Sequence, residues 1–165
     1  MSYAKYEVKM SMLGIDELIK SFEKKADNLD SIMTNAINET LEFGKEFIKT
    51  EANTIRLPDE RQAYQESYVV NATKIGNQII GYVKTDNQKA TYAENGTGIV
   101  GSRHPNTAIK GWTYDMNKHG EAGWNYMGSD GKMHHTKGIP AQKIYYNASI
   151  QMRDKLKELI LKALK

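Results

Sequence analysis

The most regular pattern of apolar and polar positions lies between Leu29 and Ile55. Apolar residues recur there every three or four positions, with charged residues on the other side, which is the period of an α-helix. Proline cannot continue a helix, so Leu57 and Pro58 mark its end. The pattern predicts a long amphipathic helix whose apolar stripe must be covered by a sheet or by another helix. Gly44 has the lowest helix propensity on this stripe, so we expect it to mark close packing or a bend. The stripe is Leu29, Ile32, Met33, Ala36, Ile37, Leu41, Gly44, Phe47, Ile48, Ala52 and Ile55.

The same period predicts two further helices. The first is short and precedes the long helix, so that residues 13–56 form a helical part. The second covers residues 140–164 and begins near Pro140, because proline is favoured at the first helical position. The first stripe is Ile15, Leu18, Ile19, Phe22 and Ala26. The second stripe is Ala141, Ile144, Tyr145, Ala148, Met152, Leu156, Leu159, Ile160 and Ala163.

Strand-like patterns occupy shorter segments. Residues Tyr3–Met10 alternate weakly, as in a half-buried strand or a loose arm. Ser67–Thr73 and Gln78–Lys84 are rich in β-branched and aromatic residues and are separated by a short turn, which predicts two paired strands. We interpret the polar stretch Pro58–Gln65 as a connector, and Thr91–Ala93 as a short strand that pairs next in the sheet.

These elements predict the fold class. Helices that cover one face of an antiparallel sheet give an α+β domain. We expect an antiparallel sheet of about four strands, with residues 66–95 as its main part, packed by the long N-terminal helix and by the C-terminal helix. A chain of 165 residues has the length of one ordinary domain, so we expect residues 1–165 to form a single domain.

Glycine is concentrated in one part of the chain. Nine of the thirteen glycines fall within residues 96–138, which makes this segment a glycine-rich ribbon. A near-repeat inside it places Trp112 and Tyr114 twelve residues before Trp124 and Tyr126. The period of a strand puts each Trp and Tyr on one face, so the repeat predicts a hairpin that presents four rings. Such rings form either a small private core or a protein interface.

The first glycines of the ribbon have a familiar spacing. Gly96, Gly98 and Gly101 match a dinucleotide-binding fingerprint, but that motif binds pyrophosphate only between a strand and a helix. The residues that follow have no helical apolar period, and Pro105 favours an extended conformation at His104. We therefore reject the nucleotide interpretation and expect no cofactor.

Composition narrows the function classes. The 23 basic and 20 acidic side chains leave a net charge of +3, which is too small to argue for specific nucleic-acid binding. Cysteine is absent, which excludes disulfides, Cys-based zinc sites and thiol nucleophiles. No stretch approaches the roughly 20 apolar residues of a membrane span, and the first residues lack the pattern of a signal peptide. We expect a protein made in the cytoplasm that has no membrane partner.

The histidines are the remaining candidates for chemistry. His134 and His135 are adjacent in a short segment, residues 132–136, that extends the predicted hairpin, and on a strand they face opposite sides. The sequence shows no metal-ligand spacing, nucleophile motif or phosphate-binding loop, so we expect a protein that is not an enzyme. The alternative is a small basic nuclease, or another enzyme that processes nucleic acids, in which one of these histidines is a general base and loop cations bind phosphate.

Two blocks of residues carry a resemblance to a known family. The first block is Ala90, Tyr92, Glu94, Gly96, Thr97 and Gly98, after helices and a strand pair. The second is Gly138, Pro140 and Ala141, followed by Ile144–Ala148. In this pattern the chain resembles the tail-completion, or head-tail joining, family of minor structural proteins of long-tailed bacteriophages. Relatives carry an aromatic residue where this chain has Asn95.

The resemblance implies a virion component that acts at the neck or the upper end of the tail and is assembled in the host cytoplasm. Copies would form a six-fold ring in contact with other neck and tail proteins, such as the tail tube and the head-completion protein. DNA can pass through such a ring without specific nucleic-acid binding. A ring requires head-to-tail contacts, and we expect the ribbon to supply one surface and the first strand or the helices to supply the other. The candidate interface residues are Glu94, Gly96, Thr97, Gly98, Trp112, Tyr114, Trp124 and Tyr126.

Overall fold

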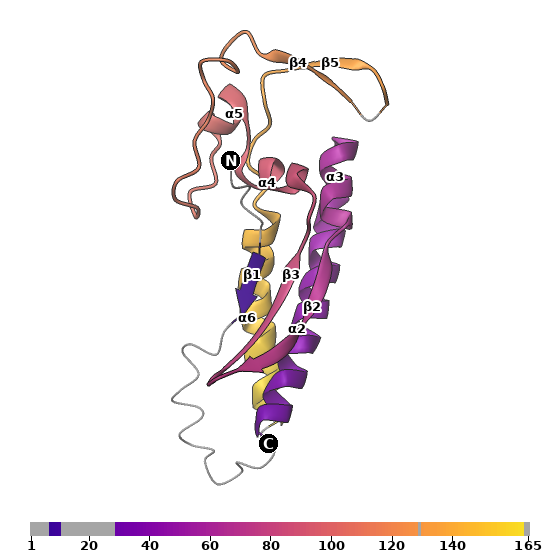
Figure 1. The fold of residues 1–165 in the computed structure, drawn as a ribbon, viewed down its shortest axis with the longest axis vertical. Coiled ribbons are helices and arrows are strands. Elements are labelled where there is room, and N and C mark those ends of the chain that lie inside the picture. The colour runs from indigo at the N-terminus through magenta and orange to yellow at the C-terminus, as the bar shows by residue number, and fades with distance from the viewer. Residues whose placement is uncertain (1–6, 11–28, 129, 164–165) are drawn as a thin grey trace.

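The computed structural model describes residues 7–10, 29–128 and 130–163. Helices and strands are mixed along the chain, which confirms the expected α+β class (Figure 1). The elements are β1 (Glu7–Met10), α2 (Leu29–Ala52), α3 (Pro58–Gln65), β2 (Tyr68–Ile75), β3 (Gln78–Lys84), α4 (Gln88–Asn95), α5 (Gly98–Arg103), β4 (Trp124–Met127), β5 (Met133–Thr136) and α6 (Ile144–Ala163). The short helix predicted from Ile15 to Ala26 lies outside the described residues.

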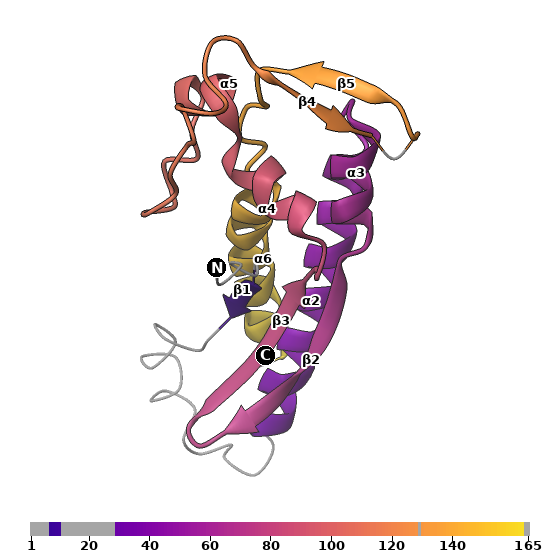
Figure 2. The same ribbon diagram turned by 45° about the horizontal axis from the view of Figure 1, so that its top comes forward.

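The two long helices, α2 and α6, lie side by side against the sheet, and α2 begins at the end of the molecule where α6 ends (Figures 1 and 2). Gly44 allows them to approach closely, because a Cβ added there would lie 2.3 Å from the sulfur of Met152. The expected role of Gly44 in close packing is therefore confirmed. Both apolar stripes supply the core. Its largest fully buried apolar side chains are Tyr64, Tyr145, Met33, Ile37, Leu41, Ile48, Met152 and Val83.

The main sheet has the strand order β1-β3-β2, and both pairings are antiparallel. Val83, at the centre, pairs with Val8 on one side and Val69 on the other. The register of β2 shifts between Val70 and Thr73. Among the described residues this sheet has three strands, not about four, because the segment predicted as its fourth strand is helical.

The fourth strand was predicted at Thr91–Ala93, within what the structure shows to be α4. The β-branched and aromatic residues there suggested a strand, but Asn87 begins a helix by accepting a hydrogen bond from the backbone N–H of Lys89, at 3.1 Å. The polar connector predicted at Pro58–Gln65 is also wrong, since this segment forms α3. Its first residue is a proline and its first turn is acidic, both of which favour a helix start.

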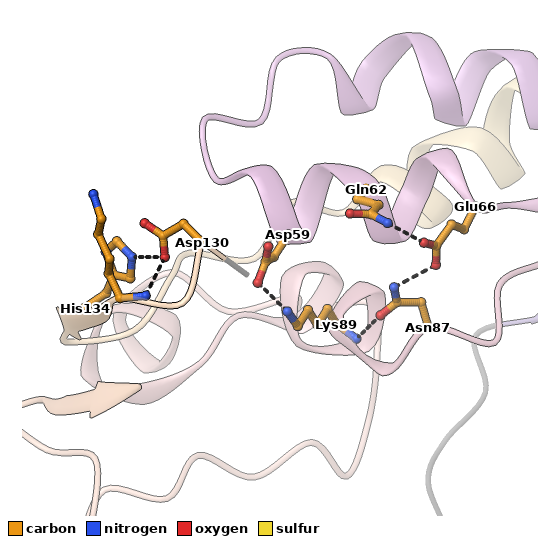
Figure 3. Close-up of polar contacts among 8 residues, drawn as sticks. Asp59, Gln62, Glu66, Asn87, Lys89, Asp130 and His134 are labelled. Atoms are coloured by element: carbon orange, nitrogen blue, oxygen red, sulfur yellow. Dashed lines mark hydrogen bonds and ion pairs between the residues drawn. The ribbon is translucent and has the colours of Figure 1, made fainter. Parts of the chain in front are cut away.

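Polar contacts hold α3 against α4 (Figure 3). The side-chain amide of Asn87 donates to Glu66, at 2.7 Å, and Gln62 donates to the same carboxylate, at 2.8 Å. At the other end of α3, Asp59 forms an ion pair with Lys89, which is also at the start of α4. These contacts fix the direction in which α4 leaves the sheet.

The aromatic hairpin does not form between the two Trp-Tyr repeats. β4 pairs instead with β5, with Trp124 opposite Thr136 and Met127 opposite Met133, whereas residues 111–114 form no strand. A tight turn accounts for this choice, since the N–H of Gly128 donates to the carbonyl of Lys132 at 2.9 Å. Both views show the β4–β5 pair at one end of the molecule, close to α3 (Figures 1 and 2).

The C-terminal helix begins later than predicted. α6 starts at Ile144 rather than near Pro140, because Lys143 has a left-handed φ of 59°. The carbonyl of Lys143 accepts the first helical hydrogen bond, from Asn147 at 2.9 Å. None of the described helices combines the length and the apolar character that a bilayer span requires.

Candidate functional site

The two sequence blocks that carry the family resemblance meet in space. The link after α4 runs beside the link before α6, and the backbones of the two links are joined directly. The N–H of Thr97 donates to the carbonyl of Ile139 at 2.9 Å, and the N–H of Gln142 donates to the carbonyl of Ala93 at 2.8 Å. Segments more than 40 residues apart along the chain thus form one joint, and the candidate site is built on it.

Glycine is required where the two links touch. Gly138 has a φ of 101°, and a Cβ added to it would lie 1.9 Å from the carbonyl oxygen of Thr97. Gly98 has a φ of 57°, and an added Cβ would lie 2.6 Å from the carbonyl oxygen of Lys137 and 2.7 Å from the Trp124 ring. A side chain at either position would be strained and would separate the two segments.

Glu94 lies at the centre of this joint. It is fully buried at the end of α4, and its carboxylate lies against the first turn of α6. The backbone N–H groups of Tyr145 and Tyr146 donate to it at 3.0 and 2.9 Å, and the hydroxyl of Tyr64 on α3 donates at 2.9 Å. The first N–H groups of a helix have no partner within the helix. Glu94 therefore caps α6 from a different helix and also ties α3 to both.

Two opposing effects act on the pKa of Glu94. Burial raises the pKa of this carboxyl above its ordinary value, and the hydrogen bonds from the backbone and from Tyr64 lower it. Burial is the larger effect, so the net shift is upward. The negative charge is nevertheless favoured by the positive end of the α6 dipole.

A second buried polar pair extends the network. The hydroxyl groups of Ser67 and Tyr145 lie 2.6 Å apart, and the rings of Tyr145 and Tyr64 are tilted against each other with centroids 5.4 Å apart. Burial raises the pKa of the Tyr145 hydroxyl far above its ordinary value. All three of these side chains are buried, so the network is enclosed rather than open to a small ligand.

The first Trp-Tyr repeat packs on the link between α4 and α5. The indole N–H of Trp112 donates to the carbonyl of Gly96 at 3.1 Å, and the hydroxyl of Tyr114 donates to the carbonyl of Asn95 at 2.9 Å. The exposed ring of Tyr92 lies beside Trp112, with centroids 6.2 Å apart. The predicted site residues Trp112 and Tyr114 thus hydrogen bond to the two residues that follow Glu94.

The second repeat reaches other parts of the molecule. Trp124 lies over Gly98, and its ring centroid is 4.2 Å from that of His119. Tyr126 faces His134 across the β4–β5 pair, with ring centroids 5.6 Å apart. Burial raises the pKa of Tyr126, and the nearby Glu60 carboxylate raises it further, which places this ring close to α3. Seven of the eight predicted site residues therefore gather on or around the α4–α5 link, and Tyr126 lies towards α3.

Asn95, which replaces the aromatic residue of the resembling family, is also buried. Its side-chain amide donates to the carbonyl of Thr91 at 3.1 Å. Its side-chain oxygen has no hydrogen-bond partner among the described residues. A short polar side chain therefore occupies this place beside Glu94.

The two adjacent histidines point in different directions. The His134 ring nitrogen lies 2.9 Å from the carboxylate of Asp130 (Figure 3), whereas the His135 ring nitrogen lies 3.0 Å from the side-chain oxygen of Asn125. His134 lowers the pKa of the Asp130 carboxyl by hydrogen bonding to it. Within the part of the chain that the structure describes, no group of three or more His, Cys, Asp or Glu side chains is arranged to hold a metal ion.

Two residues of the site, Tyr64 and Ser67, have no signal in the sequence, where they fall in a predicted connector and at the start of a predicted strand. Tyr145 belongs to the second block of the resemblance and to an apolar stripe, but neither pattern shows its contact with Ser67. The partners of Glu94 are 30 to 52 residues away along the chain, so no local spacing reveals them. The one available signal was a charged residue between Ala93 and Asn95 in an otherwise small and polar segment.

In comparisons with protein-family models, with curated proteins and with solved structures, none matches this chain.

Proposed function

We propose that this chain is a structural component of a bacteriophage or prophage particle. It acts at the head-tail interface or the tail end, where copies form a ring that completes the tail and lets it join the filled head. Its partners are other neck and tail proteins, such as the tail tube and the head-completion protein. It is assembled in the host cytoplasm and then resides in the virion, and residues 1–165 act as a single domain without enzymatic activity.

The observation that carries this proposal is the contact between the two blocks of the resemblance. Glu94 from the first block caps the helix that begins in the second block. Gly138 allows the close approach of the two backbones. The two blocks are far apart in the sequence, but the structure of each depends on contacts with the other. This supports the interpretation that together they form one structural motif.

The outer face of the β4–β5 pair supports a docking role for the ribbon. Residues directly opposite each other share a face of an antiparallel pair, so Met127 and Met133 lie together. Each of them is 61 % exposed. Asn125 and His135 are exposed on the same face. Methionine is common at surfaces that bind other proteins, and we assign this face to contacts with neck or tail proteins.

The nuclease alternative receives less support from the geometry. Hydrolysis at a phosphate requires a base, a cation site and a bound phosphate in one place. His134 and His135 face opposite sides of β5 and hydrogen bond to different residues, Asp130 and Asn125. We therefore propose that these two exposed histidines are surface residues of the ribbon and have no catalytic role.

An in vitro joining assay tests the proposed function. Filled heads and free tails are purified from a phage that lacks this gene and are mixed with the purified protein. We expect infectious particles to form only when the protein is added. The same mixture with heat-denatured protein is the control, and heads and tails that join equally well without the protein would contradict the proposal.

A further inference from the structure

One exposed face of α6 combines apolar and basic side chains. Tyr146, Ile150, Arg153, Lys157 and Leu161 follow one another at intervals of four, three, four and four positions, so they form one stripe along the helix. The apolar members Tyr146, Ile150 and Leu161 are 43, 37 and 42 % exposed. Between them lie the exposed cations Arg153 and Lys157. Neither cation forms an ion pair with any of the described residues.

One exposed face of α2 has the same spacing and the opposite charge. Its central residues are Asn35, Glu39, Glu42, Glu46 and Thr50, all of which are exposed. Phe43, beside Glu42, is 37 % exposed and adds an apolar contact. The stripe on α2 and the stripe on α6 therefore have the same length. The stripe on α2 carries acidic side chains and the stripe on α6 carries basic ones.

Neighbouring charges reduce this contrast but do not remove it. Lys45 pairs with Glu42 and lies 3.6 Å from Glu46. On α6, Asp154 borders the basic stripe, while Glu158 is paired with Lys155 at 3.2 Å. Glu39 forms no ion pair within the described part of the chain, so the acidic stripe keeps an uncompensated charge.

We infer that the basic stripe of α6 in one copy docks on the acidic stripe of α2 in a second copy. The two surfaces lie on different elements of the same chain, so the contact is head-to-tail and each copy can make it twice. Since α2 and α6 lie side by side in one subunit (Figures 1 and 2), the docking continues the helical layer from copy to copy. The inference that such contacts close the copies into a ring rests on the proposed function, whereas the contact between two copies does not.

This assignment leaves the ribbon available for other proteins. If helices form both sides of the contact between copies, the exposed Met127 and Met133 face outward from each copy. Charge complementarity selects the partner surface and fixes its register. The apolar residues at both ends of the α6 stripe then exclude water around the charges, which strengthens their attraction.

Charge reversal tests the contact in the full chain. The first variant carries Arg153→Glu with Lys157→Glu, and the second carries Glu39→Lys with Glu46→Lys. Sedimentation velocity at low ionic strength and increasing protein concentration measures self-association. We expect wild-type protein to associate and each variant to associate at least roughly 100-fold more weakly, because like charges then face each other.

Mixing the two variants gives the decisive result. The reversed α6 of the first variant is acidic and meets the basic α2 of the second, and the remaining pair of stripes is unchanged. An equimolar mixture should therefore recover wild-type association, although each variant alone associates much more weakly. Lys110→Glu with Lys118→Glu, which changes charge equally on exposed loop residues, is the control and should associate as wild type does.

Three results would overturn the inference. These are a wild-type protein that remains monomeric throughout the titration, reversal variants that associate as wild type does, and a mixture that does not recover association. Each concerns the contact between copies alone. The joining assay decides the proposed function separately, so a protein that joins heads to tails but fails these tests would retain its function and lose this interface.

Discussion

Replacing Glu94 with glutamine removes the negative charge to which Tyr64, Tyr145 and Tyr146 donate hydrogen bonds. Glutamine keeps one acceptor oxygen, but its amide nitrogen is a donor and would face a backbone N–H at the start of α6. A buried donor left without a partner costs about 1–3 kcal/mol, although relief of the buried charge offsets part of this. We expect Glu94→Gln to lower the free energy of unfolding by about 2 kcal/mol near neutral pH.

The pH dependence of this loss distinguishes Glu94 from an ordinary buried side chain. Burial raises its pKa above the ordinary value of 4.5, so the folded protein binds the proton more tightly than the unfolded chain does. This contribution to stability is fully present below the ordinary value and is lost as pH rises through the raised one. Glutamine does not titrate. The difference in unfolding free energy between wild type and variant should therefore be largest at acidic pH and decrease as pH rises.

Urea denaturation followed by far-ultraviolet circular dichroism measures this difference from about pH 4 to pH 8 at constant ionic strength. Tyr64→Phe is a matched control, since it removes one donor and keeps the ring, and it should cost about 1 kcal/mol. In the double variant, the decreases in unfolding free energy caused by Tyr64→Phe and Glu94→Gln should not add fully, because the two residues share a hydrogen bond. A difference between wild type and Glu94→Gln that grows with rising pH would mean that the hydrogen-bond donors outweigh burial and that the pKa of Glu94 is lowered rather than raised.

Further substitutions test the joint and the rings. Gly138→Ala should lower the unfolding free energy by 2 kcal/mol or more, roughly, because the added Cβ meets the carbonyl of Thr97. Gly131→Ala, where φ is 72° and nothing lies near, should cost only about 1 kcal/mol, and equal losses in thermal denaturation would argue against the contact. Trp112→Ala combined with Trp124→Ala should leave the helical dichroism unchanged and abolish head-tail joining. A collapse of that dichroism would instead make these rings part of the core.

The long helix and the β2–β3 pair were predictable because their information is local. The apolar stripe of α2 repeats over many turns, and it contains Met33, Ile37, Leu41 and Ile48, all of which are buried. A stripe of this length has few alternative interpretations. The buried side of α6 was predicted for the same reason.

The short elements were not predictable in the same way. α4 is eight residues long, and over such a length a strand and a helix bury similar residues. The structure decides in favour of a helix because Asn87 caps its start and because Glu94, at its end, reaches the start of α6. Both effects depend on partners that a local pattern does not contain.

The candidate site shows the same division. Its first residues, from Glu94 to Gly98, were found from a compact motif, and the repeat identified the aromatic side chains that contact them. The role of Glu94 as a cap could not be found, since its partners come from α3 and α6. The predicted pairing of β4 with the first Trp-Tyr repeat was wrong for a related reason. The repeat of Trp112 and Trp124 suggested that pairing, whereas the turn after Met127 pairs β4 with β5.

Electron microscopy of lysates after disruption of this gene in its parent phage or prophage shows whether the protein is needed to join heads to tails. We expect filled heads and complete tails that are present in the same lysate but are not joined, and wild-type protein supplied from a plasmid should restore joined particles. Normal, infectious particles in the disrupted strain would show that the protein is not required for joining.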